Sequence, residues 1–137
     1  MRFETKNKLL MPRRSTRCSA GYDFYLPEDV TIAPYSMKSV DLQVSAKLEP
    51  DQTLLLFVRS SIGIKQGITL ANTVGIVDAD FYPHTIIACL KNNTSMPVKL
   101  LKGSRICQGI IVKYCLSDDD DVYCKLHRDG GIGSTGK

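Results

Sequence analysis

Apolar and polar residues alternate without exception from Val40 to Leu48, and this run limits the fold more than any other stretch of the chain. A period of two is typical of a half-buried β-strand, because successive side chains of a strand point to opposite faces of the sheet. Turn-forming residues flank the run at positions 33–34 and 49–51, and similar turn signals recur along the chain. The chain is therefore predicted to consist of short strands joined by turns.

Other segments extend this pattern. Further short strands are predicted at residues 53–58, 85–90, 97–101, 106–114 and 122–126. The one helix candidate is short, covers Ser60–Gln66 and ends at Gly67. The regular spacing of short strands predicts an all-β fold, a jelly-roll-like sandwich or barrel with one short helix.

The length of 137 residues suffices for one hydrophobic core, and we predict a single domain over residues 1–126. The Gly-rich residues 127–137 are predicted to form a flexible C-terminal arm, because glycine loses much conformational freedom when it becomes ordered. The longest apolar runs, such as residues 54–58, fall far short of the ~18 residues that a membrane-spanning helix needs.

Charge and cysteine content narrow the possible functions. The net charge is +4, and positive residues gather in positions 2–17, so a nucleic-acid-binding β-barrel is one hypothesis, although the chain has no Trp and no recognised binding motif. The five cysteines form no C-x-x-C pair, which favours small buried thiols in a reducing compartment, the cytoplasm or the nucleus. The two histidines have no ligand spacing with these cysteines, so no zinc site is expected.

Two carboxylates interrupt an apolar stretch at residues 67–82. Asp78 and Asp80 are one residue apart, and on an extended backbone both side chains would point to the same face. The stretch is predicted to form a strand, a turn and a second strand. Because burying a carboxylate is costly unless it is paired or used in chemistry, this stretch is the first candidate for an active site.

Arg59, Ser60 and Ser61 stand at the start of the predicted helix. Backbone N–H groups at a helix start, together with an arginine, favour an anion such as phosphate. The alternative is a plain serine N-cap beside a surface arginine.

Two more stretches have a composition suited to phosphate. A glycine turn at residues 102–104 leads into a predicted strand that carries Arg105 and Gln108, and the alternative is a hairpin with a polar edge. Residues 128–136 combine an arginine with several glycines and a Ser-Thr pair, which suits an arm that closes over phosphates when a ligand is present.

Five short motifs follow one another along the chain, at residues 20–24 (AGYDF), 59–63 (RSSIG), 72–81 (NTVGIVDADF), 103–108 (GSRICQ) and 130–136 (GGIGSTG). Together they resemble the motifs of the trimeric dUTPases, the deoxyuridine 5'-triphosphate nucleotidohydrolases. The resemblance implies a jelly-roll subunit that forms a homotrimer with each active site shared between subunits. The implied reaction is hydrolysis of dUTP to dUMP and pyrophosphate, which limits uracil incorporation into DNA and supplies dUMP for thymidylate synthesis.

The resemblance also implies roles for four polar side chains. Asp78 would orient and deprotonate the water that attacks the α-phosphorus. Gln108 would hold that water or the adjacent phosphate. Asp23 would lie behind the site and hold Arg59, and Asp80 would have a structural role in the turn.

Substrate recognition is implied for the remaining motif positions. Asn72 would hydrogen-bond the uracil, helped by main-chain groups near Gly75 and Val77, and Phe81 would pack on the deoxyribose where the family usually has a tyrosine. The residues that would meet the triphosphate are Arg59, Ser60, Ser61, Arg105, Arg128, Ser134 and Thr135. Mg²⁺ would be held through phosphate oxygens and water, with no direct protein ligand.

The fifth motif departs from the family pattern at two positions. Ile132 replaces the aromatic residue that commonly covers the uracil, and Arg128 stands one residue nearer to the paired glycines than usual, with His127 in the expected place. An active enzyme with a looser lid is therefore expected.

Two other functions remain as alternatives. One is a catalytically weakened dUTPase-like binding or signalling module. The other is a relative of dCTP deaminase, which would need a glutamate on the strand predicted at residues 85–90, where this chain has no carboxylate.

Overall fold

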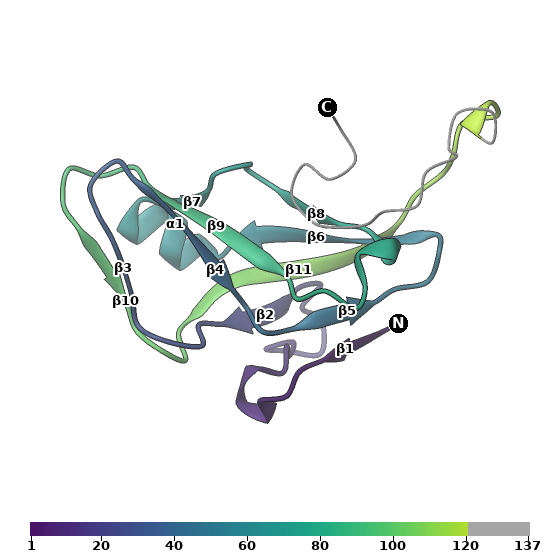
Figure 1. Ribbon diagram of the computed structural model, residues 1–137, viewed down its shortest axis with the longest axis horizontal. Helices are drawn as coiled ribbons and strands as arrows, with labels where there is room; N and C mark the ends of the chain where they lie inside the picture. The colour runs from purple at the N-terminus through teal and green to yellow at the C-terminus, as the bar shows by residue number, and fades with distance from the viewer. Residues whose placement is uncertain (121–137) are drawn as a thin grey trace.

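The computed structural model describes residues 1–120, which form an all-β fold with one α-helix and two 3₁₀ helices (Figure 1). The strands are β1 (Arg2–Glu4), β2 (Tyr22–Tyr25), β3 (Val30–Ile32), β4 (Met37–Asp41), β5 (Ser45–Lys47), β6 (Gln52–Val58), β7 (Ile68–Leu70), β8 (Gly75–Val77), β9 (Ile87–Asn92), β10 (Val98–Leu100) and β11 (Arg105–Lys113). The helices are η1 (Lys8–Leu10), α1 (Ser60–Gln66) and η2 (Ala79–Phe81). The all-β prediction is confirmed, whereas the predicted arm and the strand predicted at 122–126 lie outside the described residues.

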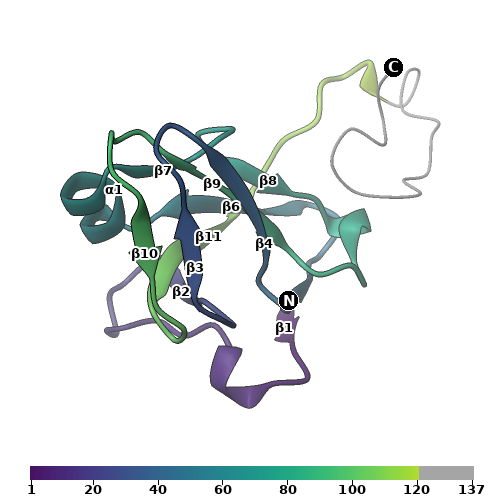
Figure 2. The ribbon, with the colours of Figure 1, turned by 60° about the vertical axis from the view of Figure 1, so that its left-hand side comes forward.

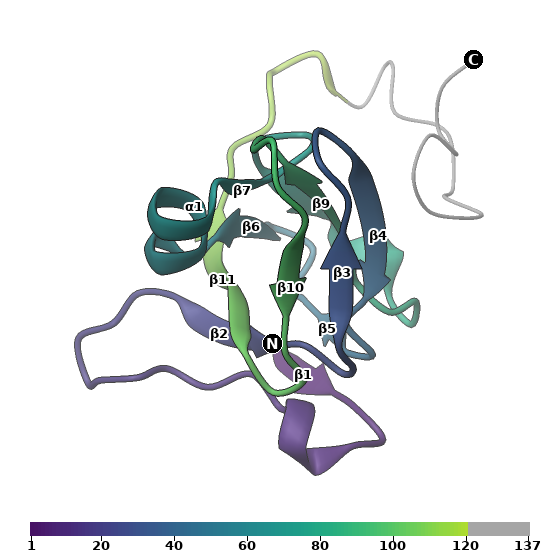
Figure 3. The ribbon, with the colours of Figure 1, turned by 90° about the vertical axis from the view of Figure 1, so that its left-hand side faces the viewer.

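The strands pair antiparallel in four small sheets. The largest has the order β2–β11–β6–β8, a second has the order β4–β9–β7, and the pairs β1–β5 and β3–β10 complete the set. The β2–β11–β6 part lies across from β3, β4 and β9 (Figures 2 and 3). Side chains from both sides form one core, which includes Phe24, Leu54 and Ile106 from the first side and Val30 and Leu90 from the second.

The alternating run at residues 40–48 is buried on its apolar side as predicted, but it is not one strand. The strand breaks between Asp41 and Ser45, where Gln43 has a φ of 57° and donates its N–H to Asp41 Oδ1 at 2.8 Å. This corner lets β4 pair with β9 and β5 pair with β1. The apolar positions therefore stay buried while the chain changes sheets, although Ser45 is buried as well, at 7% exposed.

Helix α1 has the predicted bounds. Gly67 follows it with φ 66° and ψ 21°, a left-handed conformation that glycine adopts without strain, and its N–H donates to Gly63 O and Ile62 O. The N-cap is Arg59, which makes no side-chain cap hydrogen bond, and Ser60 is already the first helical residue. The alternative of a serine N-cap is therefore wrong.

The candidate stretch at residues 67–82 contains the predicted strand, turn and second strand. Strands β7 and β8 flank the turn, but they do not pair with each other, because β7 pairs with β9 and β8 pairs with β6. After Val77 the chain enters η2, so Asp78 and Asp80 do not share one extended strand. Asp78 stands at the N-cap of η2 without a side-chain cap hydrogen bond, and the turn is closed by the Phe81 N–H, which donates to Asp78 O at 3.2 Å.

The described cysteines have no disulfide partner, and they differ in exposure. Among the four cysteines within residues 1–120, the prediction of buried thiols holds only for Cys107, because Cys89 is half-buried and both Cys18 and Cys115 are exposed. Burial raises the pKa of the Cys107 thiol to about 12. Within residues 1–120, no helix has the length and apolar character needed to cross a membrane.

Candidate active site

A buried carboxylate holds two arginines at one end of β2, β6 and β11. Asp23 is 4% exposed; its Oδ1 pairs with Arg59 Nε at 2.9 Å and its Oδ2 with Arg105 Nη1 at 3.2 Å. Ser15 Oγ donates to the same Oδ2 at 2.7 Å and accepts from Arg105 Nη1 at 2.9 Å. We call these four residues the Asp23 cluster. Two guanidinium charges face one carboxylate, so the cluster is positive, which suits a phosphate-bearing ligand.

Strand register explains why these distant residues meet. Asp23 on β2 lies opposite Gln108 on β11, and Gln108 lies opposite Phe57 on β6. Arg59 follows β6 directly, and Arg105 opens β11 after the tight turn at Gly103, whose φ is 77°. Residues predicted from three separate motifs are therefore neighbours in one sheet.

Gln108 lies half-buried against the backbone at Gly21. A Cβ atom at Gly21 would lie 3.2 Å from Gln108 Oε1 and 3.3 Å from Gln108 Cβ, closer than ordinary contact. The absence of a side chain at Gly21 therefore makes room for the amide. Ser60 and Ser61 are exposed beside Arg59 at the start of α1.

The residues predicted to read the base and sugar lie along positions 72–81. Asn72 is exposed in the turn before β8, whereas Val77 is buried and Phe81 is half-buried in η2. Gly75 lies opposite Leu56, and a Cβ at Gly75 would lie 3.2 Å from Leu56 Cβ. A larger residue there would be crowded, so the close packing of β8 on β6 depends on this glycine.

The two predicted catalytic residues are far apart in one chain. Asp78 comes directly after Val77, which pairs with Leu54, and so lies level with Thr53 of β6. Gln108 pairs with Phe57, four residues along β6 and on its other side. A strand rises about 3.3 Å per residue and neighbouring strands lie about 4.8 Å apart. An offset of four residues along β6 and two strand spacings across the sheet therefore puts the Cα atoms of Asp78 and Gln108 roughly 16 Å apart. No single water contacts both side chains of one subunit at that separation.

Two cavities lie away from the Asp23 cluster. One, of about 560 Å³, is lined by Asp78, Ala79 and Asp80 together with Leu48, Pro50 and Tyr114, so both carboxylates border open space. The predicted site residues thus fall into two separate groups, which we call the candidate half-sites: the Asp23 cluster with Gln108, and the segment 72–81 with its cavity.

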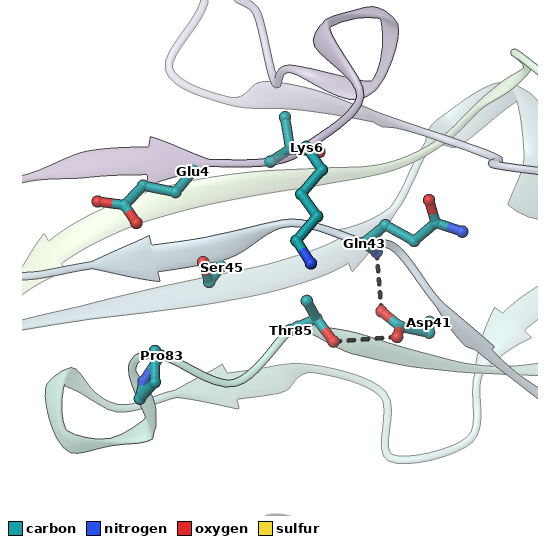
Figure 4. Close-up of a pocket in the computed structure, with 8 residues that line it drawn as sticks. Glu4, Lys6, Asp41, Gln43, Ser45, Pro83 and Thr85 are labelled. Atoms are coloured by element: carbon teal, nitrogen blue, oxygen red, sulfur yellow. Dashed lines mark hydrogen bonds between the residues drawn. The ribbon is translucent and has the colours of Figure 1, made fainter.

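The other cavity, of about 540 Å³, contains no predicted site residue (Figure 4). Lys6 points into it, and Asp41 on its wall accepts hydrogen bonds from Thr85 Oγ1 at 3.0 Å and from the Gln43 N–H at 2.8 Å. Asp41 therefore secures the corner between β4 and β5.

Ser15 belongs to the site but was not predicted. It precedes the first motif inside the basic segment, and a lone serine there carries no spacing signal that would have identified it. The predicted residues Arg128, Ile132, Ser134 and Thr135 lie outside the described residues. Among residues 1–120, no group of three His, Cys, Asp or Glu side chains is arranged to hold a metal ion.

Comparison with known proteins gives the family. The family model for dUTPase matches residues 7–136. A deoxyuridine 5'-triphosphate nucleotidohydrolase from Lactococcus lactis is 35% identical over 131 residues, covering 92% of this chain and 87% of that protein. The crystal structure of dUTPase from Streptococcus mutans superposes with a TM-score of 0.82 at 34% identity, over 86% of this chain and 99% of that one.

A more distant structure shares the fold alone. It is a mutant dUTPase from phage phi11 of S. aureus, described for its coordination of a structural Mg(II) ion, with a TM-score of 0.76, 19% identity and coverage of 85% and 92%. The family match spans the Asp23 cluster, Gln108 and the segment 72–81. This chain belongs to the dUTPase family.

Proposed function

We propose that the protein hydrolyses dUTP to dUMP and pyrophosphate. The observation that carries this proposal is the Asp23 cluster, in which one buried carboxylate orients two guanidinium groups beside Gln108. Asp23 pairs with Nε of Arg59 and with Nη1 of Arg105, and each guanidinium group has further N–H donors suited to phosphate oxygens. The names of the similar proteins from L. lactis and S. mutans support the same activity.

Asp78 is proposed to activate the water. A carboxylate accepts a proton from water as the water attacks the α-phosphorus, and the P–O bond to the pyrophosphate leaving group breaks. Gln108 is proposed to hold that water or the adjacent phosphate by its amide. Most of the barrier reduction in phosphoryl transfer comes from positioning and charge stabilisation, which here falls to Arg59, Arg105 and the exposed Ser60 and Ser61.

A homotrimer would bring the two half-sites together. Because Asp78 and Gln108 are roughly 16 Å apart within one chain, they reach the same attacking water only if they come from different subunits. The outward face of the β11–β6–β8 sheet carries the row Ile110, Leu55 and Ile76, and Ile76 is 65% exposed. Such an apolar row suits contact with another subunit.

Uracil selection is proposed for the turn before β8. The Asn72 amide, with main-chain groups of Gly75 and Val77, offers hydrogen bonds to the uracil edge, which cytosine would oppose by placing donor against donor. The Phe81 ring is half-buried in η2 and offers an apolar face to the deoxyribose. Asp80 is proposed to support this turn rather than to take part in the chemistry.

Mg²⁺ is proposed as the cofactor, bound mainly through the substrate. The described residues supply no cluster of three metal-ligating side chains, and Mg²⁺ commonly uses substrate phosphates and waters in place of a protein cage. When bound, the ion neutralises part of the triphosphate charge. Arg128, Ser134 and Thr135 are proposed to complete the phosphate contacts, and Ile132 to cover the uracil.

A substrate panel tests the proposal. Purified protein with Mg²⁺ is given dUTP, dTTP, dCTP or UTP separately, and pyrophosphate release is measured, with Asp78→Asn as the inactive control. Release from dUTP alone is expected. Silence on all four nucleotides would instead support the binding module, whereas the deaminase alternative already lacks the carboxylate it needs on β9.

A further inference from the structure

We propose that Ser15 is a positioning residue that fixes Arg105 in the orientation needed to bind the triphosphate, an inference that rests on the function proposed above. Ser15 Oγ, Asp23 Oδ2 and Arg105 Nη1 form a closed triangle with sides of 2.7, 2.9 and 3.2 Å. A hydroxyl group donates and accepts at once, so it links the carboxylate to the guanidinium. The direct pair between Asp23 and Arg105 is the longest side of this triangle.

Arg105 needs such support more than Arg59 does. The Arg105 side chain is 45% exposed and that of Arg59 is 25% exposed. A long exposed side chain samples many rotamers, and ordering it on binding costs free energy. The second contact from Ser15 restricts Arg105 before the substrate arrives, which is the physical meaning of preorganisation.

The loop that carries Ser15 is itself fixed. It leads from η1 to β2, loops out beside β2 (Figure 3), and is joined to β2 by a backbone bridge between Arg13 and Asp23. The Asp23 N–H donates to Arg13 O at 2.8 Å, and Arg14 Nη1 donates to Arg17 O at 3.0 Å and to Ser19 O at 3.2 Å. Arg14, one of the N-terminal arginines, therefore holds the loop together, so this part of the basic segment has a structural role.

Removing the hydroxyl tests the role. Ser15→Ala is expected to lower kcat/KM for dUTP about tenfold, as one charge-assisted hydrogen bond is lost. The inhibition constant of pyrophosphate should rise by a similar factor, whereas that of deoxyuridine, which has no phosphate, should not change. Ser15→Thr keeps the hydroxyl and should restore most of the activity. If Ser15→Ala does not fold, Ser15→Cys, with its weaker hydrogen-bonding group, replaces it.

A double mutant separates positioning from a general structural effect. If Ser15 acts through Arg105, adding Ser15→Ala to Arg105→Ala should change kcat/KM by less than about twofold. Ser39→Ala, an exposed serine on β4, is the matched control and should behave as wild type.

The outcomes distinguish this inference from the proposed function. A wild-type protein that releases no pyrophosphate refutes the proposed function and removes the basis for the inference. If the wild type is active and Ser15→Ala is equally active, the role of Ser15 is refuted and the proposed function stands. The same holds if the losses of kcat/KM from Ser15→Ala and Arg105→Ala multiply in the double mutant.

Discussion

Two inactive variants of this protein should restore each other's activity when their subunits mix. The first variant, Asp78→Asn, loses the proposed water-activating carboxylate, and the second, Gln108→Ala, loses the amide beside the Asp23 cluster. Each alone should retain no more than about a hundredth of wild-type activity, the usual cost of removing one group that acts in the transition state. The two changes lie in different half-sites of the chain.

The expected recovery follows from the separation along β6. Since the two residues are roughly 16 Å apart in one subunit, the proposed active site would take Asp78 from one chain and Gln108 from another. In an equimolar random mixture each of these is intact with a chance of one half, so about a quarter of all sites are complete in a symmetric oligomer. Pyrophosphate release should therefore reach about a quarter of the wild-type rate per subunit.

The assay needs subunits that have exchanged. The variants are co-refolded from denaturant, and different affinity tags on the two chains verify that mixed oligomers have formed. If mixed oligomers form and their activity stays at the mean of the two parents, the reasoning from strand geometry is wrong, and both residues serve a site within one chain.

Three further predictions follow from single contacts. Asp23→Asn places an N–H donor against the donors of Ser15 and Arg105, or against the donor of Arg59. The free energy of unfolding in urea should therefore fall by about 2–4 kcal/mol, and KM for dUTP should rise. An unchanged free energy of unfolding would contradict the role of the Asp23 cluster. Gly109→Ala would put a Cβ 2.7 Å from Leu54 Cδ1 and 2.8 Å from Phe24 Cε2, and should lower the unfolding free energy by about 1–3 kcal/mol in the same titration. The Cys107 thiol, buried with its pKa raised to about 12, should react with a thiol reagent at pH 8 only after unfolding, and rapid native labelling at this position, mapped by mass spectrometry, would show that β11 opens locally.

Short-range patterns predicted the elements that local physics decides. The helix Ser60–Gln66 was predicted with its observed bounds, since the glycine that ends it is a local signal. The burial of Val40 and Leu48 also follows from period two alone. The corner at Gln43 was not predicted, because glutamine carries no preference for positive φ and the turn depends on contacts with other strands.

Contacts between residues far apart in the sequence are the part of the site that could not be predicted. The resemblance placed Asp23 behind Arg59, and the structure shows this ion pair at 2.9 Å. The second anchor of Asp23, on Arg105, and the hydroxyl of Ser15 depend on how β2 meets β11, which no local pattern records. Asp80 was expected in a turn, and the structure shows that this turn is the 3₁₀ helix η2, a form that a single alanine between two acids does not specify.

The seven residues of β6 also set a distance. Its first residues lie level with Asp78 and its end leads into Arg59, so the length of the strand sets the distance between the two candidate half-sites of one subunit. Deleting two adjacent residues would preserve the inward and outward parity of the side chains, and with it the burial pattern, yet would shift one half-site by about 7 Å relative to the other. Substitutions in β6 that keep side-chain volume should therefore affect mainly the free energy of unfolding, whereas a change in its length should affect mainly kcat/KM.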